Sequence, residues 1–159
     1  MSKIRKSWQE KLADNKDLPK VVEINDKMSE RWGTGTVVIP APKEVDEIMK
    51  KVPEGKLITT SQIRTLLAKK HSASIGCPLT TGIFAWVAAH AAEEAAAEGK
   101  GNITPYWRTL KTGGELNEKY PGGIEAQAAR LREEGHTIEP GKGKKLPKVK
   151  DFEKALVEL

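Results

Sequence analysis

The stretch QIRTLLAKKHSASIGCPLTTGIFAWVAAHAAEEAAAE, residues 62–98, contains two helical patterns joined by a link of small residues. In the first pattern three apolar residues recur at the spacing of one helix face: Ile63, Leu66 and Leu67. This spacing predicts a helix over 62–70. Residues 71–78 predict a turn-like or short helical link, because serine, glycine and proline favour turns.

The second pattern, residues 80–98, is the strongest helical signal in the chain. A run of alanines supplies high helix propensity, and Gly99 ends the helix. We expect Phe84 and Trp86 in the core. The larger side chains that share one face of this helix are Ile83, Trp86, Val87 and His90. Helix, turn and helix together are the outline of a helix-turn-helix.

The residues before this pair predict a lead-in. Residues 7–32 are charged and mostly helical in pattern, with a break at Pro19. Residues 33–39 predict a short strand. A helix follows from Pro42, with apolar residues at helical spacing, and Pro53 helps to end it.

The residues after the pair predict a wing and a closing helix. Residues 106–117 predict a β-hairpin around the glycine turn 111–114, which is a natural wing behind a helix-turn-helix. A helix over 124–134 ends at Gly135. Residues 140–147 predict a flexible basic linker.

A short amphipathic helix that Asp151 caps, with Phe152, Leu156 and Leu159, closes the chain. We therefore predict an α+β fold, mainly helical, with a winged helix-turn-helix. Its parts are a helical and β lead-in over 1–41, the winged helix-turn-helix domain over 42–138, and a basic linker with a short helix over 139–159.

The composition limits the function classes. Lys and Arg number 27 against 22 Asp and Glu, and the net charge of +5 with a pI of about 9.2 weakly favours a polyanionic partner. No apolar run approaches the roughly 20 residues of a membrane span, so we expect a cytoplasmic protein without a membrane partner. The single cysteine excludes an intrachain disulfide. The scattered histidines indicate no metal site, and we expect no cofactor.

Basic residues gather near both ends of the chain: Lys3, Arg5 and Lys6, then Lys142, Lys144, Lys145, Lys148 and Lys150. Solvated tails and phosphate contacts both explain these groups.

Six short motifs follow one another in the order found in a known family. They are VPEGKLITT (52–60), QI (62–63), SASIG (72–76), PYWR (105–108), YPGG (120–123) and LREEG (131–135). Through them the chain resembles, over 42–138, the carboxy-terminal domain of the alkylguanine-DNA alkyltransferases, which are methylated-DNA-protein-cysteine methyltransferases. The resemblance implies a winged helix-turn-helix that enters the DNA minor groove. It also implies a pocket for a flipped alkylated guanine, whose alkyl group passes irreversibly to the cysteine of a Pro-Cys-His-Arg motif.

The residues of the transfer reaction are replaced in this chain. Tyr106 stands at the position of the nucleophilic cysteine, Trp107 at that of the activating histidine, and Ala128 at that of the glutamate that orients the histidine. Transfer needs a low-pKa thiolate and a base within reach, which these residues cannot supply. The chain is therefore closest in type to the cysteine-less alkyltransferase-like proteins, which bind alkylated DNA without repairing it.

Two DNA-facing family residues are also replaced. Ala73 stands at the position of the arginine that enters the groove, and Thr60 at that of the tyrosine that helps to rotate the base. Base flipping by the family's mechanism is therefore not expected from these two residues.

Two sets of candidate site residues follow. The pocket set is Pro105, Tyr106, Trp107, Arg108 and Tyr120. The DNA-binding set is Thr60, Lys69, Lys70, Ser72, Ala73, Thr80, Thr81 and Lys111. The aromatic pair either stacks a base or fills the vacated space, and Arg108 suits a structural hydrogen bond. Helix capping, a helix dipole or simple exposure also explains the DNA-binding set.

We predict non-catalytic binding of double-stranded DNA, with sensing of alkylated guanine and a repair protein as a further partner. One alternative is an active methyltransferase that uses Cys77, which lies just before a helix. The other is a protein-interaction module on a DNA-binding fold that no longer binds DNA, with contacts from the amino-terminal extension or the Phe152 helix.

Overall fold

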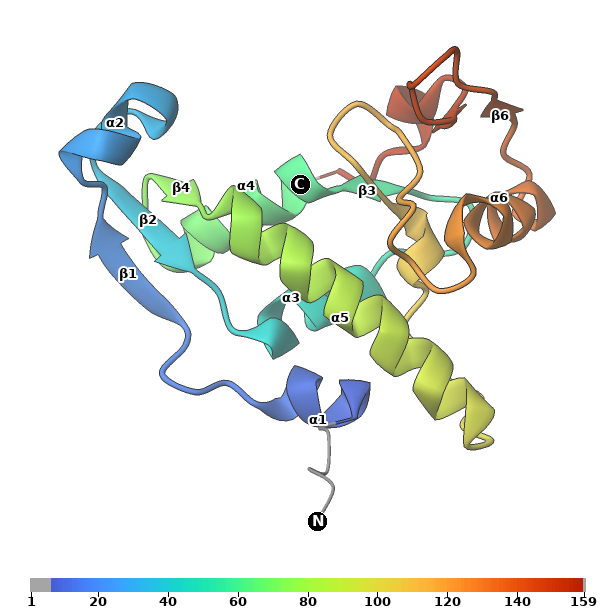
Figure 1. The fold of residues 1–159 in the computed structure, drawn as a ribbon, viewed down its shortest axis with the longest axis horizontal. Helices are drawn as coiled ribbons and strands as arrows, with labels where there is room; N and C mark the ends of the chain where they lie inside the picture. Colours follow the sequence, from blue (N-terminus) through green and yellow to red (C-terminus); the bar gives the residue numbers. More distant parts are fainter. Residues whose placement is uncertain (1–6, 159) are drawn as a thin grey trace.

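Helix α5 (Pro78–Ala97) runs through the middle of the molecule (Figure 1). The computed structural model describes residues 7–158, so the predictions for Lys3, Arg5, Lys6 and Leu159 lie outside the described residues. The other helices are α1 (Trp8–Ala13), α2 (Asp26–Trp32), α3 (Pro42–Lys50), α4 (Thr60–Lys70) and α6 (Gly123–Glu133). The strands are β1 (Lys20–Glu23), β2 (Thr36–Ile39), β3 (Ile58–Thr59), β4 (Ile75–Gly76), β5 (Thr109–Leu110), β6 (Ile138–Glu139) and β7 (Lys148–Val149). The predicted α+β class is confirmed, as are the helices α3 to α6 and the strand β2.

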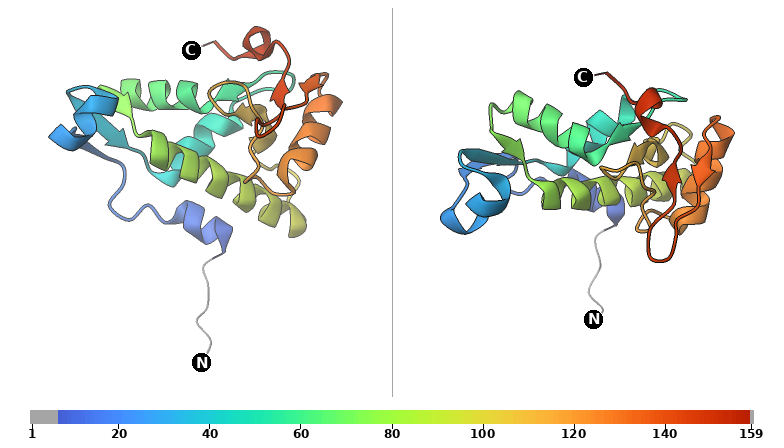
Figure 2. Two further views of the ribbon diagram at one scale, coloured as in Figure 1. Left: turned by 45° about the horizontal axis from the view of Figure 1, so that its top comes forward. Right: turned by 90° about the horizontal axis from the view of Figure 1, so that it is seen from above.

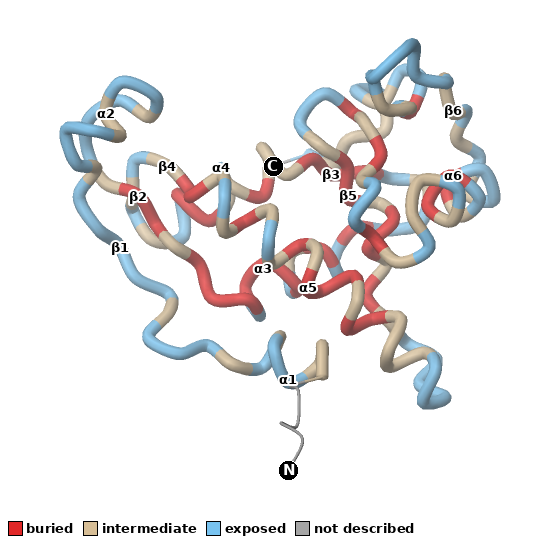
Figure 3. The backbone as a smooth tube through the Cα atoms, in the orientation of Figure 1, coloured by how far each residue is buried: buried red, intermediate tan, exposed pale blue. Residues whose placement is uncertain are grey.

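The core lies where α3 and α4 pack against α5, and the buried segments in Figure 3 follow this contact. The buried face of α5 is made of small residues, among them Ala85, Ala88 and Ala89. Small side chains let neighbouring helices approach closely. Two of the larger residues of α5 lie off the core, since Ile83 is exposed and Trp86 is only half-buried, whereas Phe84 is partly buried and packs against the core. The prediction that Trp86 is a core residue was wrong.

A three-stranded sheet of order β1-β2-β4 lies at the amino-terminal end of α5 (Figure 2). Strand β2 is antiparallel to β1 and parallel to β4. Residues 20–23 were predicted to be helical and 71–78 to form a turn or short helix, so β1 and β4 correct both predictions. These segments are too short to show a period, and pairing with β2 decides their conformation.

The predicted hairpin wing does not form a two-stranded ladder. Strand β5 instead lies parallel to β3, with Ile58 opposite Thr109. The glycine turn does form, because the Gly114 N–H donates to the Lys111 carbonyl at 2.9 Å. Beyond the turn, Glu115 bridges to Lys148 in β7. The chain after the turn therefore pairs with the carboxy-terminal segment rather than with β5.

The carboxy-terminal segment is packed on the fold. Strands β6 and β7 form an antiparallel pair on either side of the predicted linker, so residues 140–147 are the loop that joins these two strands. The predicted helix is a 3₁₀ turn, Phe152–Ala155, and Asp151 makes no side-chain cap there. Leu57 donates to the Ala155 carbonyl at 2.9 Å and accepts from the Val157 N–H at 2.8 Å. Long-range pairing with the β3 strand thus replaces the expected local helix.

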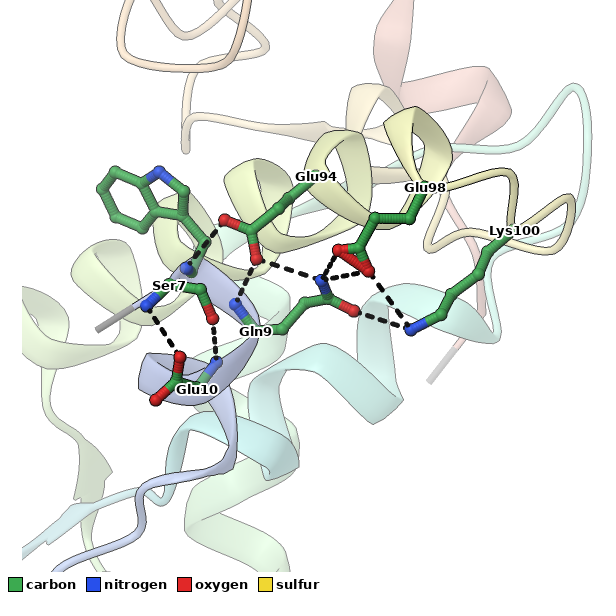
Figure 4. Close-up of polar contacts among 7 residues, drawn as sticks. Ser7, Gln9, Glu10, Glu94, Glu98 and Lys100 are labelled. Atoms are coloured by element: carbon green, nitrogen blue, oxygen red, sulfur yellow. Dashed lines mark hydrogen bonds and ion pairs between the residues drawn. The ribbon is translucent and has the colours of Figure 1, made fainter. Parts of the chain in front are cut away.

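Hydrogen bonds, shown in Figure 4, and aromatic ring contacts both hold helix α1 on α5. Glu94 accepts from the backbone N–H groups of Trp8 and Gln9 at 3.1 and 3.2 Å. The Trp8 ring lies 4.5 Å from the His90 ring and 5.0 Å from the Trp86 ring. These contacts attach the lead-in to the outer face of α5, which the alanine-based core leaves open.

Candidate nucleic-acid interface

The motif turn, Tyr106–Arg108, is a 3₁₀ turn between α5 and β5 whose two aromatic side chains are buried. Tyr106 is 3% exposed and its hydroxyl donates to Glu93 Oε1 at 2.7 Å. Trp107 is 8% exposed and its indole N–H donates to Glu134 Oε2 at 2.8 Å. Both rings therefore have fixed partners inside the fold.

Further aromatic and cationic groups close off the motif turn. The rings of Tyr106 and Trp107 meet edge to face at 5.3 Å, and Tyr120 meets Tyr106 in the same way at 5.4 Å. The Arg130 guanidinium lies over the Trp107 ring, 4.3 Å from its centroid. Ala128, which we predicted to stand at the position of the orienting glutamate, is buried in the core. Of the two interpretations of the aromatic pair, the geometry agrees with filled space.

Burial also sets the chemistry of the phenol. Burial raises the pKa of Tyr106, and the hydrogen bond to the Glu93 carboxylate raises that pKa further. The phenol therefore stays protonated near neutral pH. A protonated, hydrogen-bonded phenol is no substitute for a thiolate nucleophile.

Arg108 acts as a clamp. Its guanidinium donates to both carboxylate oxygens of Glu134 at 2.9 and 2.8 Å, and a third N–H donates to the Val52 carbonyl at 2.7 Å. The pair is largely buried, with side-chain exposures of 14% and 7%. Arg108 thus joins the end of α6 to the end of α3, which is the structural role expected for it.

A hollow beside the motif turn carries cations that are already paired. It measures about 660 Å³, and its cationic lining residues are Lys50, Lys100, Arg108 and Arg130. Each forms an ion pair: their respective partners are Asp46, Glu98, Glu134 and Glu93. Lys50 and Arg108 pair with buried carboxylates and are therefore the least available to an anion, whereas the pairs of Lys100 and Arg130 are solvent-exposed and weak.

The amino-terminal half of α5 borders a different hollow of about 570 Å³, called here the α5 hollow. Its lining residues are Thr60, Pro78, Leu79, Gly82, Ile83, Trp86, Lys111, Asn117, Glu118 and Lys119. Two predicted DNA-binding residues, Thr60 and Lys111, thus meet at one place although 51 positions separate them in the chain. The predicted DNA-binding set did not include Leu79 or Ile83. Their four-residue spacing on a face without alanine was the available signal.

Contacts within the chain hold the wall of the α5 hollow that faces helix α5. His90 Nε2 lies 2.9 Å from the Lys119 carbonyl, and the Asn117 N–H donates to Gln127 Oε1 at 2.8 Å. Lys111 pairs with Glu118 at 3.0 Å, whereas Lys119 forms no ion pair with another described residue. The Lys111 pair is solvent-exposed, so it is weak and open to exchange with a phosphate.

A third hollow, of about 540 Å³, lies on α4 and the link that follows it. Lys69, Ser72 and Ala73 of the DNA-binding set line it. Lys69 is exposed and makes no ion pair with any residue in 7–158. Ser72 has a left-handed backbone with φ of 53°, which turns the chain sharply after α4. This hollow runs along α4 from Ser61 to Lys69, whereas α4 contributes only its first residue, Thr60, to the α5 hollow.

Three predicted DNA contacts face inward or are engaged elsewhere. Thr81 has no exposed surface, which removes it from the residues able to contact a phosphate. Thr80 is half-buried, and its hydroxyl oxygen is shielded from solvent. Lys70 pairs with Glu44 at 2.7 Å, beside His71 at the same distance from that carboxylate. Burial acts to raise the pKa of Glu44, but hydrogen bonds from Lys70, the Ala41 backbone and His71 outweigh it and lower that pKa overall.

Cys77 is a buried, free thiol immediately before α5. Its backbone N–H donates to the Val38 carbonyl at 2.9 Å, which extends the β2-β4 pairing.

Within residues 7–158 no group of three or more His, Cys, Asp and Glu side chains is arranged to hold a metal ion. No helix in the same range is long and apolar enough to cross a membrane.

Comparison with known proteins gives one structural match to report. No family model and no curated protein matches the chain. The fold is similar to that of S. pombe Atl1, an alkyltransferase-like protein, whose structure was determined in complex with damaged DNA containing O6-carboxymethylguanine. The TM-score is 0.51 at 18% sequence identity, and the match covers 74% of this chain and 94% of the other. The chain therefore has an α+β fold similar to that of an alkyltransferase-like protein.

Proposed function

We propose that this chain binds double-stranded DNA without transferring an alkyl group, and that it prefers duplexes with alkylated guanine. The observation that carries the proposal is the buried Tyr106 at the nucleophile position, in a fold similar to that of a protein crystallised with damaged DNA. A chain with this fold and no reactive group at the motif turn is suited to recognition rather than repair. The same proposal includes a repair protein that binds the complex of this chain with DNA.

The α5 hollow is the proposed DNA-binding surface. Thr60 stands at the position of the family's tyrosine that helps to rotate the base, and Lys111 and Lys119 border the same hollow. Lysines at a groove edge supply affinity through phosphate neutralisation. We place this surface within residues 42–138, with 1–41 and 139–159 as supporting segments, in a cytoplasmic protein.

A competition titration tests the proposal. A labelled duplex with one O6-methylguanine is bound at low salt and displaced by unlabelled plain or alkylated duplex, and anisotropy is recorded. We expect the alkylated competitor to act at lower concentration, and we expect affinity to fall steeply with salt. Equal displacement by the plain and the alkylated competitor would contradict the proposed lesion preference. Absence of binding at low salt would contradict DNA recognition altogether.

Alkyl transfer to Cys77 is an alternative that burial of the thiol disfavours. Intact mass spectrometry after incubation with alkylated duplex tests it directly. We expect an unchanged mass; a gain of one methyl group on Cys77 would overturn the non-catalytic proposal.

A protein-interaction module is the second candidate function, and strand β1 favours it. The strand lies at the edge of its sheet, and Val21 and Val22 are both exposed. Exposed edge strands are suited to pairing with another chain. Failure to bind either duplex at low salt would favour this candidate over DNA recognition.

A further inference from the structure

The α5 hollow contains the most exposed large apolar side chain of the described residues. Leu79 is 69% exposed and Ile83, one turn later, is 41% exposed. Both line the α5 hollow beside Lys111 and Lys119. Two exposed apolar side chains one turn apart form a small apolar patch, beside which Lys111, Glu118 and Lys119 also line the hollow, whereas the solvent-facing side of a surface helix is usually polar.

Gly82 lies between these two residues and has no role inside the chain. A β-carbon at Gly82 would meet no heavy atom within 4 Å, and the backbone there is helical. Glycine in a helix interior is destabilising relative to alanine, the residue that dominates the rest of α5. A glycine that the packing of the chain does not require leaves room for a ligand to approach the helix backbone closely from outside.

The backbone beneath Leu79 is firmly placed. Pro78 occupies the first helical turn, and the Thr81 N–H donates to the Cys77 carbonyl at 3.1 Å. The opposite face of α5 is buried through its alanines. Leu79 is thus a short apolar side chain on a fixed backbone that projects beside the hollow. Apolar side chains held in this way enter base steps and unstack them in several DNA-bending proteins.

We propose that Leu79 is a wedge that enters a base step of bound DNA, while Gly82 lets the sugar-phosphate backbone approach α5. The proposal rests on the proposed DNA-binding function. Ala73, at the position of the family's inserted arginine, ends at its β-carbon and is too short to separate two bases. Leu79 supplies that missing insertion from the next helix, and the neighbouring lysines favour DNA over an uncharged partner.

Fluorescence of 2-aminopurine tests the wedge. Each of two duplexes carries a single O6-methylguanine and one 2-aminopurine, placed on the 5′ side of the lesion in one duplex and on the 3′ side in the other. Unstacking of 2-aminopurine raises its fluorescence emission. We expect wild-type protein to raise the emission of one duplex severalfold. Leu79→Ala should abolish most of that rise and weaken binding about tenfold. Leu79→Met should keep most of both effects. Val21→Ala, which trims an exposed apolar residue of β1, is the matched control and should change neither.

The outcomes separate the two proposals. If wild-type protein does not bind either duplex, the DNA-binding function fails and the wedge fails with it. If wild-type binds and Leu79→Ala gives the same emission and affinity, the wedge is overturned while DNA binding stands. Gly82→Ala should raise the melting temperature and weaken binding. If it raises the melting temperature without weakening binding, the close approach at Gly82 is overturned.

Discussion

The side chains of the motif turn are largely buried and hydrogen-bonded, whereas Leu79 and Ile83 in the amino-terminal half of α5 are exposed. At the motif turn the Tyr106 hydroxyl, the Trp107 indole N–H and the Arg108 guanidinium all have hydrogen-bond partners within the chain. Along α5, Leu79 and Ile83 project from the fold beside a hollow. Polar groups that are hydrogen-bonded within the chain stabilise the fold, whereas exposed apolar side chains are available to contact a ligand. The comparison separates the motif turn, as a structural element, from α5, as the proposed contact surface.

The largest effect is expected from the clamp at the motif turn. Arg108→Ala leaves the buried Glu134 carboxylate without its guanidinium and should lower the free energy of unfolding by about 3 kcal/mol. Urea unfolding measures this change. Lys111→Ala breaks an exposed ion pair instead and should cost less than about 1 kcal/mol. Similar losses for the two variants would contradict the structural assignment of the motif turn.

The pH dependence of stability sharpens the same point. Burial acts to raise the pKa of Glu134, but hydrogen bonds from Arg108, Trp107 and Gly55 outweigh it and hold the pKa below its ordinary 4.5. A carboxyl whose pKa is lower in the folded state stabilises the fold above its unfolded pKa. That contribution is lost as the pH falls through the folded value. Glu134→Gln should therefore be much less stable than wild type at neutral pH, and the gap should narrow below about pH 4. A gap independent of pH would show that the charge of Glu134 is not involved.

A smaller effect is expected when the phenol loses its hydroxyl. Tyr106→Phe removes the hydrogen bond to Glu93 and should lower the free energy of unfolding by about 1 kcal/mol. Because the ring is buried, we expect unchanged affinity for alkylated duplex, measured by anisotropy on the folded protein. A selective loss of affinity for the alkylated duplex would mean that the motif turn contacts the lesion after all.

The smallest effect is expected at the rim of the α5 hollow. Lys119→Ala should weaken duplex binding at low salt by about threefold and make the dependence on log salt concentration less steep by about one unit. Its thermal stability should stay at the wild-type level. Lys51→Ala, which removes the same charge at the end of α3, is the control and should leave the salt dependence unchanged. Equal changes in the two variants would show that net charge alone, rather than the α5 hollow, attracts DNA.

Local signals were enough to predict four of the helices and to align the motif turn with a known family. The helical spacing of Ile63 and Leu67 and the glycine after α5 are signals that span only a few residues. They can therefore be recognised in the sequence without knowledge of the fold. The candidate site was only partly predictable. Thr60 and Lys111 were named for the same surface, and the structure brings them to one hollow. The burial of Thr81 and the exposure of Leu79 depend on which face of α5 meets α3 and α4. The sequence did not indicate that face, because it is made of alanines and not of large apolar residues.

By itself the sequence determined the helical elements, the excess positive charge and the absence of a cysteine and histidine at the motif turn, because each is a property of residues that are adjacent or periodic. The tertiary structure alone decided that β5 pairs with β3 instead of folding back as a hairpin, that β1 and β4 are strands, and that Tyr106 and Trp107 fill their site. These outcomes depend on pairing and packing between segments far apart in the chain. Their energies come from long-range contacts that no local pattern records.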